Sequence, residues 1–469
     1  MASVSEHLQP VPERRKRLVI LGICSMSLLI VGLDTTIVNV ALPAIHRTFH
    51  SSLDGLQWTI DAYTLVLASL LMLSGSTADR LGRRRVFQVG LSLFSLGSLL
   101  CAVAPSLDAL IAARVLQAIG VWGGVVGISM ALGPVVGGAL VDSVGWRSVF
   151  IVNIPIGLAA ILLTALFVPE SKSDRPRRID PVGQVLVIVA LATLTYAIIE
   201  APSAGWLSAQ TIALFAVSLA SFIGLVLYEL RRREPLLEMR FFRSAPFSGA
   251  TATAVAMFMA LGGFLFLNTL YLQDVRGLSP LDAGLYTLPM AGLMLVVAPL
   301  TGRFVGNHGT RLPLVGGGLA LAASGLILTQ LTSHTSLAVL FGAYVLFGLG
   351  SGLINPPITN TAVSGMPPSQ AGVAAAVAST GRQVGQTLGV AVLGALAGTA
   401  TGAIGGDFAS ATHVSWWIVA ALGLGIAALG FITTTPWAEA TAGRAAELFR
   451  ESTRPGRAET RDQPELVAG

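Results

Sequence analysis

Long apolar stretches follow one another along this chain, and the short connectors between them alternate between arginine-rich and nearly arginine-free. Of the 29 Lys and Arg residues, 24 lie in six places: Arg14 to Arg17, Arg80 to Arg85, Lys172 to Arg178, Arg231 to Arg243, Arg303 to Arg311, and the tail from Arg444. The intervening connectors hold only Arg47, Arg147 and Arg276. Because basic loops stay on the cytoplasmic side of a membrane, this alternation predicts a chain that crosses a bilayer many times, with both termini in the cytoplasm.

The composition agrees with a membrane protein. The 469 residues are 53% hydrophobic and only 11% charged, whereas a soluble domain has about 25% charged residues. So few charges cannot cover the apolar surface of a soluble fold, so lipid must be the solvent for much of the chain. The net charge of +5 is confined to alternate loops, which favours contact with anionic lipid over nucleic acid. The Arg, Ala and Gly bias points to a bacterial cell membrane.

The apolar stretches are expected to be helices. Backbone groups in hydrocarbon must be hydrogen-bonded within the chain, and these stretches are too long and too uniformly apolar for barrel strands. The sequence therefore predicts an all-α, polytopic fold. The expected spans are 18–42, 56–78, 86–104, 147–168, 182–200, 208–230, 246–270, 283–301, 312–331, 336–356, 370–398 and 412–434.

One stretch, residues 107–141, does not fit this pattern. A single helix of this length would reach about 50 Å, which exceeds the ~30 Å hydrocarbon core. The positions of the basic loops require an even number of crossings between residues 105 and 146. The region thus needs two crossings and has the length for about one and a half.

A duplicated organisation is indicated by a spacing that occurs twice, in Gly75, Gly82 and Arg84 and again in Gly302, Gly309 and Arg311. Such repeats are typical of transporters built from two halves. We expect an N-terminal helical half at 1–170 (truncated near residue 120), two linker helices within 171–245, a C-terminal helical half at 246–437, and a disordered cytoplasmic tail at 438–469.

Asp34 lies in the middle of the first apolar stretch. A carboxylate at that depth is costly and tends to face a bundle interior or a water-filled cavity, so proton coupling is the functional hypothesis. The alternative is a structural carboxylate held by Thr or Asn partners, and Thr35 and Asn39 share a helical face nearby. Asp61, near the outer end of its helix, is a second candidate for proton exchange, with a solvated helix-end acid as the alternative.

Arg114 and Gln117 share one face of a helix. An intramembrane Arg must find carbonyls, a carboxylate or water, so Arg114 is a candidate partner of a protonatable acid, and simple hydrogen bonding between helices is the alternative. The polar residues that could line a cavity are Asn39, Gln117, Asn355, Arg382 and Gln386. The last three could equally join helices by hydrogen bonds, and the sequence does not decide between these roles.

The connector GSTADRLGRRR at 75–85 joins two spans. Gly75 and Gly82 permit a tight turn, and Asp79 can pair with Arg80 or Arg83. We expect a conformational latch there, besides the topological anchor that its positive charge provides. A stripe of small residues for close helix packing is also expected, at Gly123, Gly127, Ala131, Pro134 and Gly138.

Several kinds of chemistry have no motif in this chain. It holds no phosphate-binding Gly-Lys-Ser/Thr loop, no metal-ligand cluster and no nucleophilic serine motif. We therefore expect no cofactor, no metal and no enzymatic activity, and an ion gradient as the energy source of any uphill transport.

Five segments together resemble the major facilitator superfamily, and within it the 14-span drug:proton antiporters. The residues that carry this resemblance are LDTTIVNVALP at 33–43, GSTADRLGRRR at 75–85, ARVLQ at 113–117, GISMALGPVVGG at 127–138 and RQVGQTLGVAVLG at 382–394. Asp34 and Arg114 match the acidic and basic positions of these motifs, and Gly127, Gly133, Pro134, Gly137 and Gly138 match the antiporter motif of the fifth helix.

The resemblance implies two six-helix halves with two extra central helices. It also implies export of amphipathic drugs in exchange for protons by alternating access, by a monomer whose partners are a small-molecule substrate and protons. The chain departs from the family at ARVLQAIGVWGG, where roughly 25 to 30 residues, about one helix, are missing. Two alternatives stay open: an exporter of an endogenous metabolite or antibiotic, and a membrane protein that does not transport, either a defective variant or a sensor.

Overall fold

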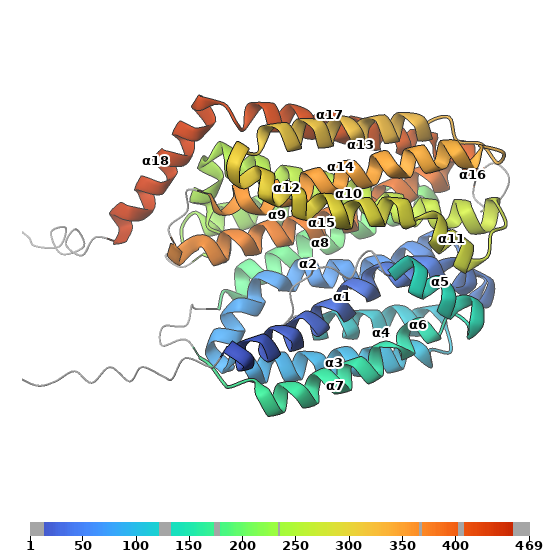
Figure 1. The fold of residues 1–469 in the computed structure, drawn as a ribbon, viewed down its shortest axis with the longest axis horizontal. Helices are drawn as coiled ribbons and strands as arrows, with labels where there is room; N and C mark the ends of the chain where they lie inside the picture. Colours follow the sequence, from blue (N-terminus) through green and yellow to red (C-terminus); the bar gives the residue numbers. More distant parts are fainter. Residues whose placement is uncertain are drawn as a thin grey trace, which may run out of the picture.

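The computed structural model of this protein describes residues 14–121, 133–172, 179–232, 235–364, 368–401 and 408–453. Within these ranges all regular structure is helical, as the sequence predicts (Figure 1). Ten helical stretches in the described part are long and apolar enough to cross a membrane. Two further helices, α1 and α15, have 36 and 34 residues. The fold is therefore that of a polytopic helical membrane protein.

The helices form two bundles and a linking pair. The first bundle comprises α1 (Arg14–Phe49), α2 (Leu53–Leu81), α3 (Arg83–Ala102), α4 (Leu107–Gly120), α5 (Gly133–Ser143), α6 (Ser148–Ile151) and α7 (Asn153–Phe167). The linking pair is α8 (Pro181–Ala204) and α9 (Ala209–Glu229). The second bundle comprises the short helix η3 (Met239–Arg243), α10 (Ala245–Leu270), η4 (Tyr271–Val275), α11 (Pro280–Tyr286), α12 (Leu288–His308), α13 (Arg311–Leu328), α14 (Leu337–Val363), α15 (Pro368–Thr401), α16 (Phe408–Ala411), α17 (His413–Ile432) and the terminal helix α18 (Pro436–Thr453).

The two bundles lie side by side with their helices roughly along one direction (Figure 1). We call the end at which α1 begins and α2 ends the proximal end, and the opposite end, where α1 ends and α2 begins, the distal end. α18 lies at the proximal end, at the left of Figure 1, and α11 and α16 lie at the distal end. The arginine-rich connectors 80–85 and 303–311 are both at the proximal end, which is the arrangement that their charge predicts.

α8 joins the two bundles along one side. Its Gln184 side chain donates to the Ser69 carbonyl of α2 at 2.6 Å, and its Glu200 carboxylate accepts from the indole N–H of Trp58, also on α2, at 3.2 Å. On the other bundle, Ile198 and Ile199 pack against Ala391 and Ala395 of α15. The linking pair is thus packed against both bundles rather than suspended between them.

The bundles also touch directly in their distal halves. Gln57 of α2 donates to the carbonyls of Val390 and Ala391 on α15 at 2.8 and 2.9 Å. Gln273 donates to the Val40 carbonyl of α1 at 2.9 Å. Between α5 and α11, a Cβ at Gly138 or Gly284 would collide with backbone of the opposite helix. Small residues therefore allow the two backbones to meet at this end.

The spacing that indicates a duplicated half has a structural counterpart. Gly82 ends α2 and Gly309 ends α12, each with a positive φ of 107° and 81°, a conformation that favours glycine. Gly120 is the fourteenth residue of α4 and lies against Gly90 and Phe94 of α3. Gly350 is the fourteenth residue of α14 and lies against Gly317 and Leu321 of α13. The third and fourth helices of both bundles thus pack at the same positions.

The stretch 107–141 shows the shortage of length that its sequence predicts. Its described helices are α4 with 14 residues and α5 with 11, roughly 21 and 17 Å, so neither described part spans the ~30 Å core alone. α4 begins and α5 ends at the distal end (Figure 1). Residues 122–132, which connect the two helices, lie outside the described ranges. The prediction of a disordered tail from residue 438 is wrong for its first part, because residues up to Thr453 form α18. Its Ala, Glu and Arg side chains are strong helix formers.

Candidate functional site

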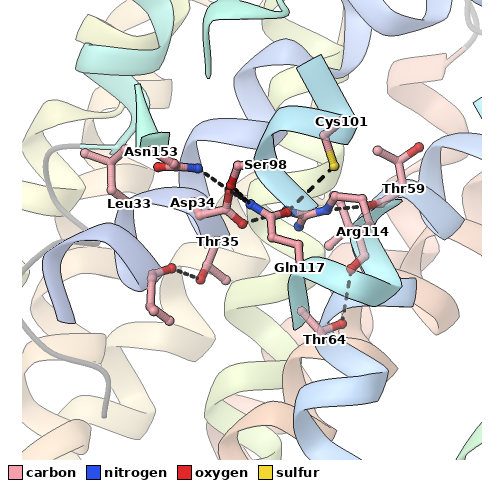
Figure 2. A network of polar contacts seen from close by, with 12 residues as sticks. Leu33, Asp34, Thr35, Thr59, Thr64, Ser98, Cys101, Arg114, Gln117 and Asn153 are labelled. Carbon is pink, nitrogen blue, oxygen red and sulfur yellow. Dashed lines mark hydrogen bonds and ion pairs between the residues drawn. The ribbon is translucent and has the colours of Figure 1, made fainter. Parts of the chain in front are cut away.

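An ion pair fully enclosed in the first bundle is the centre of the candidate site (Figure 2). Asp34 of α1 and Arg114 of α4 are joined by 2.6 Å between the carboxylate Oδ2 and the guanidinium Nη1. Their side chains are 0% and 1% exposed. The ε N–H of Arg114 donates to the Thr59 carbonyl of α2 at 3.1 Å, so the pair ties three helices together.

Two amides complete the hydrogen bonding of Asp34. Oδ1 accepts from Gln117 of α4 at 2.8 Å and from Asn153 of α7 at 2.9 Å. Gln117 also donates to the Ser98 hydroxyl of α3 at 2.8 Å, and its carbonyl oxygen accepts from Arg114 at 2.6 Å. A carboxylate is an acceptor on both oxygens only while it is ionised. The network therefore suits a negatively charged Asp34 opposite a positively charged Arg114.

Aromatic rings close the network against solvent. The guanidinium carbon of Arg114 lies 4.1 Å from the centre of the Tyr63 ring and 5.9 Å from that of Phe150, within the range of cation–π attraction. An ion pair in such a medium is sensitive to the loss of either charge. Protonation of Asp34 would remove its charge and one acceptor, and would leave Arg114 to find other partners. Loss of either charge would therefore change the contacts between α1 and α4.

Asp61 of α2 is also buried, with 0% exposure, so a solvated helix-end acid, the alternative at this position, is wrong. The physical reason is that α15 covers it. Its Oδ1 accepts from Thr64 at 3.3 Å, and Thr64 in turn accepts from Thr387 of α15 at 2.9 Å. Oδ2 has no hydrogen-bond partner among the described residues. Asp61 therefore lies at the interface of the two bundles with one oxygen available.

The polar residues nearest to Asp34 in sequence do not join its network. The Thr35 hydroxyl donates to the Val31 carbonyl, and the Asn39 amide donates to the Thr35 carbonyl, both within α1. The partners come from other helices instead. Asn153 and Ser98 are members of the network that the sequence analysis missed, and the signal that could have found Asn153 is an amide within the apolar stretch 147–168.

The connector 75–85 turns back onto its own bundle. Gly75 lies within α2, and Asp79 forms an exposed ion pair with Arg83 at 2.9 Å. Arg80 precedes the turn at Gly82 and is exposed. A Cβ at Gly82 would meet the Glu170 carboxylate, which accepts from the Arg84 amide at 3.1 Å and lies 3.7 Å from Arg85. Glu170 is therefore a partner of this connector that the sequence analysis missed.

The small residues of the fifth helix pack as the sequence predicts where they are described. Gly133 and Gly137 lie against Thr36 and Ile37 of α1, and Gly138 lies against α11. The Pro134 carbonyl contacts Gly284 of α11. Gly123, Gly127 and Ala131, also predicted for this stripe, lie outside the described residues.

The three polar candidates of the second bundle occupy two different places. Arg382 of α15 donates to the Asn355 side chain of α14 at 3.3 Å and to Thr359 at 2.5 Å. Gln386, one turn further on, is 3% exposed, and its backbone lies against Gly262 of α10. These residues belong to neither the Asp34 network nor the Asp61 contact. Among the described residues no group of His, Cys, Asp and Glu has the arrangement of a metal site.

Comparison with known proteins places the sequence among transporters. It matches the family model of the Major Facilitator Superfamily over residues 24–121 and 117–390. It is 39% identical over 412 residues to "Multidrug resistance protein Stp" of Mycobacterium tuberculosis, a match that covers 81% of this chain and 76% of that protein. It is 36% identical over 405 residues to "Tetracenomycin C resistance and export protein" of Streptomyces glaucescens, covering 81% and 75%.

The fold agrees with these matches. The crystal structure of a D-xylose-proton symporter superposes with a TM-score of 0.63 at 14% identity, covering 89% of this chain and 97% of that one. Two helical bundles with a charged network buried inside one of them define a membrane transporter rather than an enzyme. The chain belongs to the Major Facilitator Superfamily, and its relatives carry the names of multidrug and antibiotic resistance and export proteins.

Proposed function

We propose that this chain exports small amphipathic molecules from a bacterial cell in exchange for protons. The observation that carries the proposal is the enclosed ion pair of Asp34 and Arg114 with its two amide partners. Charged groups at this depth are retained for proton or ion relays rather than for stability. The names of the relatives support export of drugs or antibiotics as the direction and cargo.

In this mechanism Asp34 alternates between the ion pair and a protonated state. A proton arriving from the distal side neutralises Asp34 and releases Arg114, which lets α1 and α4 shift relative to each other. Asp61, with a free oxygen at the α2–α15 contact, is the second carrier. Gln117, Asn39, Asn355, Arg382 and Gln386 are the polar residues that we assign to the substrate path or its walls.

We assign the distal end to the outside of the cell and both termini to the cytoplasm. The arginine-rich connectors at the proximal end support this orientation. The direct contacts at Gln57, Gly138 and Gly284 then close the outward side, so this conformation is the one in which substrate enters from the cytoplasm. The connector 75–85, held by Glu170, acts as the latch of the opposite state. A monomer suffices for this cycle.

A direct test is efflux of two fluorescent dyes, the cation ethidium and the anion carboxyfluorescein, from bacterial cells that express the chain. We expect efflux of at least one dye, and its collapse when an uncoupler dissipates the proton gradient. Asp34→Asn should abolish efflux, whereas Asp142→Asn, the same change at an exposed position of α5, should leave it unchanged. Efflux that survives the uncoupler would contradict proton coupling, and efflux that survives Asp34→Asn would remove this residue from the mechanism.

A second candidate, a membrane protein that does not transport, is favoured by the short α4 and α5. The described parts of the fourth and fifth helices have 14 and 11 residues in the first bundle, whereas α14 and α15 of the second bundle have 27 and 34. We infer from this difference that the proximal parts of the fourth and fifth helices are missing from the first bundle.

The two candidates are separated by restoring this length. A chain with 26 residues copied from positions 351–376 inserted after Gly120 is compared with the original chain in the dye-efflux assay. Export by the original chain rejects the second candidate. Export by the extended chain alone supports it, and makes the short helices the reason for the loss of transport.

A further inference from the structure

Arg382 is a membrane-embedded positive charge for which the long membrane-spanning helices of its own bundle offer no carboxylate. The sequence contains no Asp or Glu between Glu238 and Asp274, between Asp282 and Asp407, or between Asp407 and Glu439. The helices α10, α12, α13, α14, α15 and α17 therefore carry no negative side chain. A guanidinium is always charged in proteins, so it cannot escape this situation by losing its proton.

The neutral groups around Arg382 use only part of its hydrogen-bonding capacity. Its Nη2 donates to Asn355 at 3.3 Å and to Thr359 at 2.5 Å, and the ring of Phe258 lies 5.8 Å from its guanidinium carbon. Its Nε is buried and has no hydrogen-bond partner among the described residues. Nε and Nη2 share one edge of the planar guanidinium, so a planar acceptor on this edge would take the free Nε–H and replace the longer contact of Nη2 with Asn355.

The contrast with Arg114 shows what is absent. Arg114 has Asp34 at 2.6 Å, and its ε N–H donates to a carbonyl. The candidate acid nearest to Arg382 along the bundle interface is Asp61. Thr387, five residues distal to Arg382, meets Thr64, three residues proximal to Asp61. The two charges are thus displaced in opposite directions from this contact, by roughly 12 Å of helix rise in total, and they do not form an ion pair.

We propose that Arg382, with Asn355 and Thr359, binds the anionic group of an amphipathic carboxylate, and that such acids are a substrate class of this protein. Arg pairs with a carboxylate through two parallel hydrogen bonds, so the ligand would accept from the free Nε–H and take the place of Asn355 on Nη2. The exposed Thr359 keeps the site open to ligand. The transport part of this inference rests on the proposed export function, whereas the binding part does not.

The test is equilibrium binding of tritiated 2-naphthylacetate to the full chain purified in a neutral detergent, measured by scintillation proximity. Its methyl ester, which has the same ring and no charge, serves as the competing probe. We expect the acid to bind about tenfold more tightly than the ester, the effect of one charge-assisted contact. Arg382→Gln should lower the affinity for the acid to that for the ester and leave the ester unaffected.

Two further variants separate charge from shape. Arg382→Lys keeps the charge and loses the planar fork, so it should retain part of the preference for the acid. Arg311→Gln removes an exposed arginine at the proximal end of α13 and should change neither affinity. Equal binding of acid and ester by the unaltered chain overturns the proposal. So does an equal loss of both in Arg382→Gln, which is the result expected of a purely structural hydrogen bond.

An anionic lipid offers a second source of the same charge. The control is phosphatidylcholine, a lipid with no net charge. Phosphatidylglycerol, which is anionic, should displace no more naphthylacetate than phosphatidylcholine does at the same concentration. Complete displacement by phosphatidylglycerol alone assigns the site to lipid and overturns the substrate class. No proton gradient is present in this assay, so it tests binding independently of export. Selective binding of the acid without uncoupler-sensitive efflux contradicts only the export function. Uncoupler-sensitive efflux without selective binding of the acid contradicts only the present inference.

Discussion

The two bundles place a polar pair at equivalent positions, and the two pairs differ in kind. Arg114 is the eighth residue of α4 and contacts Asp34 of α1. Tyr344 is the eighth residue of α14 and donates to Asn268 of α10. Both fourth helices begin after a serine N-cap, Ser106 and Ser336. The same scaffold therefore joins its first and fourth helices by an ion pair in one half and by neutral groups in the other.

The difference between the ion pair and the neutral pair distinguishes the contact that the fold requires from the charge that the proposed function requires. A neutral hydrogen bond suffices to hold the first and fourth helices together, as the second bundle demonstrates. An ion pair in the same place costs more desolvation free energy to bury than a neutral hydrogen bond, and it gives no clear advantage in stability. We infer that the charge in the first bundle is kept for proton exchange. Four predictions test this comparison, from the largest expected effect to the smallest.

Arg114→Met should have the largest effect. It leaves Asp34 buried without a countercharge, so we expect the free energy of unfolding to fall by about 3–5 kcal/mol. Thermal unfolding of the purified protein in detergent measures the change. Adding Asp34→Asn to this variant should recover much of the loss, since the uncompensated charge is then gone. A double variant as unstable as Arg114→Met alone would show that packing, not charge, is lost.

Gly120→Ala and Gly350→Ala test the packing that the bundles share. At each glycine a Cβ would meet backbone of the third helix, so each substitution should lower the free energy of unfolding by about 1–3 kcal/mol. Gly425→Ala is the control, because nothing lies within 4 Å of a Cβ there. If only one of the first two variants is destabilised in the same unfolding experiment, the two interfaces are not equivalent.

Tyr344→Phe breaks the neutral pair. It leaves the Asn268 oxygen without its donor, and we expect a cost of about 1–3 kcal/mol in the free energy of unfolding. Proton-driven transport should continue in this variant. Loss of proton coupling, measured by the response of dye efflux to an uncoupler, would mean that the second bundle shares the role that we assign to the first.

Glu170→Gln should have the smallest effect on stability. Glu170 holds the connector 75–85 through a backbone amide and a half-exposed contact with Arg85, and exposed ion pairs contribute about 0–1 kcal/mol. The equivalent Gly309 in the second bundle has no such partner within 4 Å. A loss in the unfolding experiment as large as that of Arg114→Met would show that this connector is structural rather than a latch.

The number and order of the helices followed from the sequence because hydropathy and loop charge act locally. Asp34 and Arg114 were also detectable, since a charge within an apolar stretch is rare. Their contact was not, because it depends on how α1 and α4 are rotated. Asn153 escaped notice because a single amide in an apolar stretch is a weaker signal than a charge.

Long-range packing accounts for the remaining differences. Asp61 has the sequence context of a helix end near water, and only the approach of α15 buries it. The tail has the charge content of a disordered segment, yet its helix-forming residues produce α18. The short α4 and α5 were predictable from the sequence. The charge of the flanking loops requires two crossings in this region, and the region has too few residues for two full helices.

The most direct test of the central claim compares two modes of transport in proteoliposomes that contain the purified chain. Counterflow exchanges labelled for unlabelled substrate without net proton movement, whereas accumulation driven by an imposed pH gradient requires coupling. With carboxyfluorescein as substrate, we expect the unaltered chain to perform both, and Asp34→Asn to retain counterflow while losing gradient-driven accumulation. Accumulation by Asp34→Asn at the level of the unaltered chain would contradict the assignment of proton coupling to the enclosed ion pair.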